Sequence, residues 1–324
     1  MIASPSQSPH RSMPATSVER ALLEAHVGDT YQVVREIGRG GMGIVFLARD
    51  IMLHRLVAIK VLRHEIAGAE EQRERFRREA RVTARLNDEG IVAVHGFGEK
   101  DELVYIVMEF VRGTALGSRI ATLGKMDPAE VRAIIAMLAR TLEHAHASGI
   151  VHRDLKPENI LLDHETGRPR LTDFGVALSR SADPLPSEVA RAFGTPHFMS
   201  PEQAAGETDL DGRSDIYSLG VLGYLMLTGE VPFDASHFAA IAAKHIGEAH
   251  TPIMRRAPKT PKDLADALER CLEKAPERRW KRAGELADTL ICPSNRLNLS
   301  GVVARLGRFA ALLPLSLGFI RPQC

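Results

Sequence analysis

The sequence predicts an α+β protein of two lobes, a small antiparallel sheet with one main helix followed by a larger lobe of helices. Short runs rich in β-branched and aromatic residues dominate residues 31–111, whereas helical periodicity dominates residues 112–291. The chain has 324 residues, 44% of them hydrophobic, which is enough to bury a core or two. Ligands usually bind in the cleft between two such lobes.

The first 30 residues are expected to form a mobile lead-in with a short helix near residues 18–27, because they begin with Ser, Pro and Gln and contain no signal-like apolar run. The other end, residues 292–324, contains an apolar segment of about twelve residues, against the roughly 20 that span a bilayer, and Pro314 interrupts it. We expect this segment to be buried or interfacial. Membrane contact beginning at Arg305 and Arg308 is the less favoured alternative.

The charge balance disfavours recognition of nucleic acid, because 42 Lys and Arg residues nearly equal 41 Asp and Glu residues. Any anion site must therefore be local. The cysteines, Cys271, Cys292 and Cys324, are too few and too scattered for a disulfide framework or a zinc site. Unpaired thiols are typical of a reducing compartment, so a cytoplasmic location is expected.

Five strands are expected in the first lobe, at residues 31–38, 43–50, 56–62, 90–98 and 103–110. Between the third and fourth strands, residues 70–86 predict a half-exposed helix among many charges. The apolar side of this helix consists of Phe76, Ala80, Thr83 and Ala84.

The second lobe begins with a strongly periodic helix. Asp127 and Pro128 provide a cap and a first-turn proline, and the helix should end near Gly149. The two histidines near its end, His144 and His146, are interpreted as packing residues. Residues 214–228 are apolar on nearly every side, which predicts a helix at the centre of the lobe.

The stretch "GRGGMG" places Gly38, Gly40 and Gly43 where backbone amides could approach phosphate oxygens. A glycine-rich hairpin turn explains it equally well. A Rossmann fingerprint requires a following helix, whereas "IVFLARD" predicts a strand. A Walker loop requires Lys and then Ser or Thr, where this chain has Ile44 and Val45. Both of these alternatives fail.

Two charged residues of the first lobe are candidate partners. Lys60 lies in the apolar run "VAIKVL", and Glu79 in the following helix could neutralise it and hold its ammonium toward phosphates. An edge lysine reaching solvent and a solvated glutamate are the plainer interpretations. In the second lobe, "VHRDLKPENILL" sets Asp154, Lys156 and Asn159 between two apolar ends. A loop pinned at both ends could aim all three at one point.

The motifs "GRGGMGIV", "VAIK", "HRDLKPEN", "DFG", "GTPHFMSPEQ", "DIYSLG" and "CLEKAPERRW" occur in this order, and together they resemble the protein kinase family over residues 31–291. The "KPEN" run resembles serine/threonine kinases, and "MSPEQ" is similar to bacterial members. The resemblance implies the two-lobed protein-kinase fold, with ATP and Mg²⁺ as cofactors. It also implies transfer of the γ-phosphoryl group to Ser or Thr hydroxyls of proteins, including the chain's own.

The resemblance also implies a nucleotide site. Its residues are Ile37, Gly38, Arg39, Gly40, Gly41, Met42, Gly43, Ile44, Val45, Ala58, Lys60, Met108, Glu109, Val111, Asn159 and Asp173. Among them, Lys60 would contact the α and β phosphates and pair with Glu79, and Asn159 and Asp173 would hold Mg²⁺.

Further roles implied by the resemblance concern catalysis and support. Asp154 would accept the proton of the substrate hydroxyl, and Lys156 would stabilise charge on the transferred group. His152 and Asp215 would brace the catalytic loop, and Glu202 would pair with Arg279.

Two alternatives to an active protein kinase are considered. A catalytically silent pseudokinase would act as a nucleotide- or partner-binding scaffold, although every phosphate-handling residue is present. A small-molecule kinase of the aminoglycoside-phosphotransferase type usually has Gly in place of Arg153 and lacks a "GTP…SPEQ" segment, so the sequence argues against it. The departures from the family pattern, such as Ala275 where Asp is usual, do not touch the phosphate-handling residues.

Overall fold

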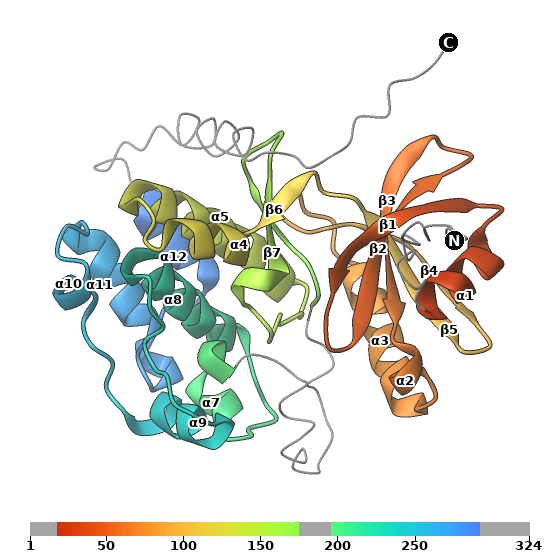
Figure 1. Ribbon diagram of the computed structural model, residues 1–324. Coiled ribbons are helices and arrows are strands. Elements are labelled where there is room, and N and C mark those ends of the chain that lie inside the picture. The colour runs from red at the N-terminus through yellow and green to blue at the C-terminus, as the bar shows by residue number, and fades with distance from the viewer. Residues whose placement is uncertain (1–17, 175–195, 292–324) are drawn as a thin grey trace, which may run out of the picture.

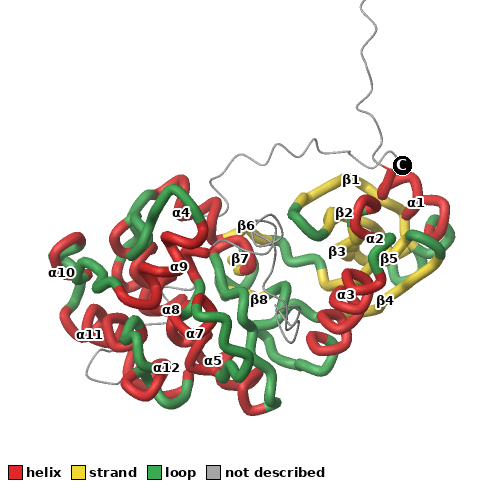
Figure 2. The backbone as a smooth tube through the Cα atoms, turned by 90° about the horizontal axis from the view of Figure 1, so that it is seen from below, coloured by secondary structure: helices red, strands yellow, loops and turns green. Residues whose placement is uncertain are grey.

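The computed structural model describes residues 18–174 and 196–291. It consists of two lobes, one built mainly of strands and the other of helices (Figure 1). The same division is visible from below, where the strands β1–β5 gather at one side and most helices at the other (Figure 2). The predicted α+β class with two lobes is therefore confirmed.

The first lobe contains a five-stranded antiparallel sheet in the order β1-β2-β3-β5-β4. Its strands are β1 (Tyr31–Arg39), β2 (Gly43–Asp50), β3 (Arg55–Leu62), β4 (Val94–Lys100) and β5 (Leu103–Glu109). The fourth strand begins later than the predicted residue 90, because residues 90 and 92 pair with Leu171 of the second lobe instead. The register places Val45 opposite Lys60 and Ala58 opposite Met108.

The helix α3 (Glu70–Thr83) packs beside this sheet and follows the one-turn α2 (His64–Ala67). Phe76, Ala80 and Thr83 are buried as predicted. Ala84 was assigned to the same apolar side, but it is exposed, since the helix ends at Thr83 and Ala84 is its C-cap. Glu79 is also buried, so it is not part of a solvated face.

A helix in the expected lead-in is part of the folded body. The predicted short helix is present as α1 (Val18–Val27), and it packs against β1, β3 and β5. Leu23 and Val27 are buried in the core on that side of the sheet, and the Glu19 carboxylate accepts a hydrogen bond from the backbone N–H of His64 at 3.3 Å. The expectation of a mobile segment is therefore wrong for residues 18–27. Residues 1–17 lie outside the described residues.

The second lobe is mainly helical, and a small sheet of order β6-β7-β8 lies near the junction of the lobes. Its elements are β6 (Gly113–Ala115), α4 (Leu116–Leu123), α5 (Pro128–Ala147), η1 (Pro157–Asn159), β7 (Ile160–Asp163), β8 (Pro169–Leu171), η3 (Pro196–Phe198), α7 (Pro201–Ala204), α8 (Gly212–Thr228), α9 (Phe238–Gly247), α10 (Ile253–Arg256), α11 (Lys262–Cys271), η4 (Pro276–Arg278) and α12 (Ala283–Ile291). Within the two described ranges, none of the helices combines the length and apolar character needed to cross a bilayer. The C-terminal apolar segment falls outside those ranges.

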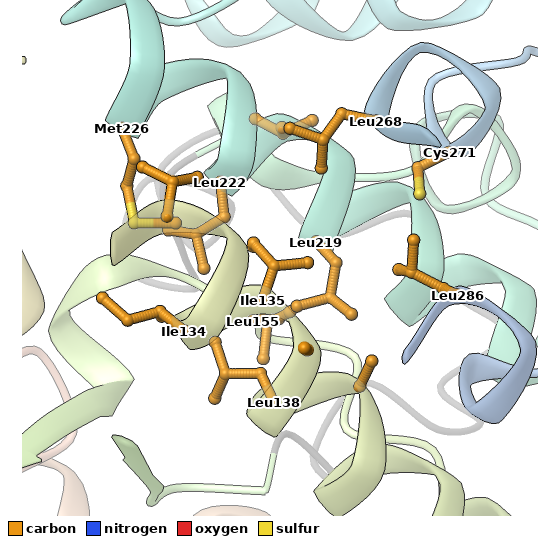
Figure 3. Close-up of a cluster of buried hydrophobic side chains, with 14 of the residues drawn as sticks. Ile134, Ile135, Leu138, Leu155, Leu219, Leu222, Met226, Leu268, Cys271 and Leu286 are labelled. Carbon is orange, nitrogen blue, oxygen red and sulfur yellow. The ribbon is translucent and has the colours of Figure 1, made fainter. Parts of the chain in front are cut away.

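The helix α8 forms the centre of the second lobe, as its apolar sequence predicts. Leucines, isoleucines and Met226 from α5 and α8 meet side chains of α11 and α12 in one core (Figure 3). Two glycines of α8, Gly220 and Gly223, allow α11 to approach closely. A Cβ atom added at Gly220 would lie only 2.7 Å from Cys271 Cβ, and one added at Gly223 would lie only 2.6 Å from Leu268 Cδ2. Each fully buried leucine of such a core contributes about 1.5–3 kcal/mol. Leu155, which lies between Asp154 and Lys156, is buried in the same core.

Candidate active site

A cleft of about 1160 Å³ lies between the two lobes. Every residue of the expected nucleotide site except Ile44 lines this cleft, and so do the expected catalytic residues Asp154, Lys156 and Glu79. Successive side chains of a strand point to opposite faces, so that Val45 faces the cleft while Ile44 is buried against α1 on the other face. The assignment of Ile44 to the nucleotide site is therefore corrected.

The glycines between β1 and β2 do not share one explanation. The N–H of Gly40 donates to the carbonyl of Gly43 at 2.9 Å and closes the turn. A Cβ atom at Gly43 would lie 2.7 Å from the carbonyl oxygen of Val61, so packing requires this glycine. Among the described residues, a Cβ atom at Gly38 or Gly40 would lie no closer than 3.8 Å to any atom beyond the adjoining residues of the chain. Packing therefore does not explain these two glycines, and their open backbone would allow a phosphate to approach closely.

Lys60 holds together three elements at the back of the cleft. Its Nζ lies 2.8 Å from Glu79 Oε1 of α3 and 2.9 Å from Asp173 Oδ1, which follows β8. Burial by itself would lower the pKa of Lys60, but the two carboxylates outweigh it and raise the pKa above its ordinary value. Burial would likewise raise the pKa of Asp173, and Lys60 outweighs it and lowers that pKa. Lys60 therefore stays an ammonium and Asp173 a carboxylate.

The catalytic loop brings Asp154, Lys156 and Asn159 to one point, as the sequence suggested. Asp154 Oδ2 accepts hydrogen bonds from Lys156 Nζ at 2.7 Å and from Asn159 Nδ2 at 2.9 Å. Asn159 Nδ2 also donates to the carbonyl of Asp154 at 2.8 Å. One carboxylate oxygen is thus fixed by donors, and the other, Oδ1, has no hydrogen-bond donor among the residues that the structure describes, so it could accept a proton from a hydroxyl group in the cleft.

The residues expected to hold Mg²⁺ offer suitable atoms. Asn159 makes its hydrogen bonds through Nδ2, and within residues 18–174 and 196–291 its Oδ1 has no partner, so this oxygen could bind a cation. Asp173 uses Oδ1 toward Lys60, and its Oδ2 has no hydrogen-bond partner in the same ranges. An amide oxygen and a carboxylate oxygen are hard ligands of the kind that Mg²⁺ prefers. The donor set therefore fits this ion.

Buried side chains anchor the catalytic loop from below. Asp215 of α8 accepts hydrogen bonds from the backbone N–H groups of His152 at 2.8 Å and Arg153 at 2.9 Å. His152 is buried, which lowers its pKa, and its Nε2 donates to the carbonyl of Thr172 at 3.2 Å. The expected structural role of His152 agrees with these contacts.

Two features of the site were missed in the sequence. His146 Nε2 donates to Asp215 Oδ2 at 2.7 Å, so this histidine supports the loop anchor and is not only a packing residue. Its position at the end of a helix, just before the catalytic loop, was the available signal. The cleft is also lined by Phe238 and Ile241 of α9, which no motif indicated, beside Pro196 and His197 of the "GTPHFMSPEQ" motif.

A buried ion pair involves Glu202 in the first turn of α7. Arg279 lies 2.7 Å from Glu202 Oε1 through Nη1 and 2.8 Å from Glu202 Oε2 through Nη2. Ser214 Oγ also donates to Glu202 at 2.6 Å. Burial would raise the pKa of Glu202, but these donors outweigh it and lower the pKa. The implied pairing of Glu202 with Arg279 is present.

Comparison with known proteins shows the family to which a chain with this site belongs. The family model of the protein kinase domain matches residues 31–289. The serine/threonine-protein kinase PrkC of Bacillus subtilis is 40% identical over 266 residues, which cover 82% of this chain and 40% of PrkC. PknB of Mycobacterium leprae, also described as a serine/threonine-protein kinase, is 40% identical over 270 residues, covering 82% of this chain and 43% of PknB. The chain thus spans less than half the length of these relatives.

A solved structure is also similar. The crystal structure of the Mycobacterium tuberculosis PknI kinase domain matches with a TM-score of 0.63 and 31% identity, and the match covers 81% of this chain and 95% of that domain. The residues matched by the family model, 31–289, include both lobes that enclose the cleft.

Proposed function

The chain belongs to the protein kinase family, and from this premise we propose that it is an ATP-dependent serine/threonine protein kinase. The observation that carries the proposal is the arrangement of the Asp154 carboxylate: Lys156 and Asn159 hold one oxygen, and no donor of the described part of the chain holds the other, which could accept from a hydroxyl group. The proposed substrates are Ser and Thr hydroxyls of proteins, including those of the chain itself. The kinase domain is placed at residues 31–291, with the lobes meeting between residues 111 and 112.

The proposed place of ATP is the cleft end lined by the glycine-rich turn. Val45, Ala58 and Met108 would surround the adenine, while the backbone of Glu109 and Val111 would bind its edge. At the other end of the nucleotide, Lys60 would hold the α and β phosphates. Glu79 and Asp173 support this, because they keep the Lys60 side chain charged and extended into the cleft.

Phosphoryl transfer depends on positioning and on charge neutralisation. Asp154 would orient the acceptor hydroxyl toward the γ-phosphorus and take its proton. Lys156 lies beside Asp154 and would stabilise the negative charge on the transferred group. Asn159 and Asp173 would hold Mg²⁺, which would supply positive charge to neutralise the phosphates. No observation favours the pseudokinase alternative.

The direct test is transfer of labelled phosphate from ATP to a protein or peptide rich in Ser and Thr, with the modified residues mapped by mass spectrometry. We expect activity in the wild-type chain with Mg²⁺, and a loss of about 100- to 10,000-fold in kcat for Asp154→Asn. Asp101→Asn is the matched control, because Asp101 lies in the β4–β5 turn at a positive φ of 53°, which Asn also adopts readily. An inactive wild-type chain, or an active and folded Asp154→Asn variant, would overturn the proposal.

A further inference from the structure

The peptide group between Arg153 and Asp154 has both its N–H and its carbonyl hydrogen-bonded to side chains. The N–H of Asp154 donates to His152 Nδ1 at 3.3 Å, and the carbonyl of Arg153 accepts from Gln203 Nε2 at 2.8 Å. Arg153 itself has a φ of +66°, a conformation that costs a residue other than glycine about 1 kcal/mol or more. The direction in which the Asp154 side chain leaves the backbone therefore depends on these supports.

Hydrogen bonds to Ser200 orient the Gln203 side chain so that its Nε2 donor faces Arg153. Its Oε1 accepts from the N–H of Ser200 at 3.0 Å, and its own N–H donates to Ser200 Oγ at 3.3 Å, which together form a capping box at the start of α7. Rotating the amide would present an NH₂ group to the Ser200 N–H and an oxygen to the Arg153 carbonyl, so both hydrogen bonds would be lost. Only one orientation satisfies both neighbours.

Ser200 ends a segment that reaches the far side of the cleft. Pro196 and His197 line the cleft, and the carbonyl of Phe198 accepts from Ser218 Oγ of α8 at 2.7 Å. Gln203 thus connects the wall of the cleft beyond the proposed phosphates to the peptide that carries the catalytic base.

We propose that Gln203 is a positioning residue for Asp154, coupling the wall formed by residues 196–200 to the orientation of the base; the inference rests on the proposed kinase function. Other groups secure the surrounding fold. The Arg153 N–H is held by the buried Asp215, and α7 is held by the pair of Glu202 and Arg279. Loss of the Gln203 donor therefore affects the aim of the carboxylate more than the stability of the lobe.

Gln203→Glu is the sharpest variant, because it keeps the shape and the acceptor for Ser200 and replaces the donor with an oxygen. Gln203→Met removes both functions at similar volume. We expect kcat to fall about tenfold or more in both variants, since small errors in the aim of a catalytic group are costly. The KM for ATP should stay within about twofold, because no proposed nucleotide contact is touched.

Gln32→Glu is the matched control. Gln32 is exposed on β1, so this substitution makes the same chemical change far from the loop. It should leave both parameters unchanged. Wild-type kcat in Gln203→Glu overturns the inference. It is equally overturned by a loss of activity that comes with a matching loss of thermal stability and of ATP affinity, because that would be a general structural effect.

Amide hydrogen exchange keeps the test independent of activity. Exchange in residues 151–160 should rise in Gln203→Met and remain unchanged in Gln32→Glu. If the proposed function is wrong, the result differs: the wild-type chain transfers no phosphate, but amide exchange in residues 151–160 is still faster in Gln203→Met than in Gln32→Glu. Equal exchange in all three proteins would contradict the positioning role itself.

Discussion

Arg170 grips the carboxylate of Glu109 with two hydrogen bonds, from Nη2 to Oε2 at 2.6 Å and from Nη1 to Oε1 at 3.2 Å. Glu109 ends β5, where the chain passes from one lobe to the other. The same guanidinium donates to the carbonyl of Ile91 at 3.0 Å and lies 3.7 Å from Asp163 of β7. Because Arg170 precedes Asp173 by three residues, this contact links the proposed adenine end of the cleft to the proposed metal end.

Arg170→Met should raise the KM for ATP about fivefold, the equivalent of about 1 kcal/mol, because Glu109 and the hinge backbone lose their support. Steady-state kinetics at varied ATP measures this effect. Arg168→Met is the control, since Arg168 is two residues away and pairs with Glu89 at the surface. Equal KM values for the two variants would show that the contact between Arg170 and Glu109 does not shape the nucleotide site.

Lys60→Met should lower kcat far more than it weakens ATP binding. The adenine contacts remain, whereas the phosphates lose the ammonium that orients them. ATP affinity from calorimetry, compared with kcat, separates the two effects, and exposed Lys100 provides a Lys→Met control. Affinity that collapses in step with kcat would contradict the orienting role of Lys60.

Arg279→Met should lower the free energy of unfolding by about 3–5 kcal/mol, because it leaves the buried Glu202 charge without its partner. Denaturant unfolding measures the change. Arg282→Met breaks an exposed pair with Glu143 and should cost less than about 1 kcal/mol. Similar losses in both variants would mean that burial of the pair is not the deciding factor.

Stability should fall between pH 6.5 and pH 5 in a way that depends on His245. Burial, assisted by the nearby Lys274, lowers the pKa of this histidine from its ordinary 6.5 to about 3. The unfolded chain therefore takes up a proton below pH 6.5 while the folded chain does not, and stability that is fully present above pH 6.5 is lost as the pH falls. The contribution over this range is about 2 kcal/mol.

His245→Asn tests this directly, because an amide does not titrate and Asn can still pair with the Tyr217 hydroxyl, which lies 2.9 Å from His245 Nδ1. The wild-type chain should lose about 2 kcal/mol more than the variant between pH 6.5 and 5. His54→Asn at an exposed turn should keep the wild-type slope. Parallel slopes for the wild type and His245→Asn would rule out the buried histidine as the source.

Short-range patterns in the sequence were enough to predict the α+β class and the two lobes, and they gave the order of the motifs whose residues line the cleft. Strand composition, helical periodicity and glycine-containing turns are each visible within a short segment of sequence, and phosphate chemistry requires particular residue types. The catalytic loop is the clearest example. Asp154, Lys156 and Asn159 lie within six residues, so their convergence required only that the loop be pinned at its apolar ends.

Tertiary structure alone decided which distant side chains support that loop and the hinge. Gln203 meets Arg153 across 50 residues, Arg170 meets Glu109 across 61, and His146 meets Asp215 across 69. It also placed α1 against the sheet, where Leu23 and Val27 are buried. Such contacts leave no periodic trace in the sequence, because each depends on how separately predicted elements pack around one another and on which polar groups are then buried without water.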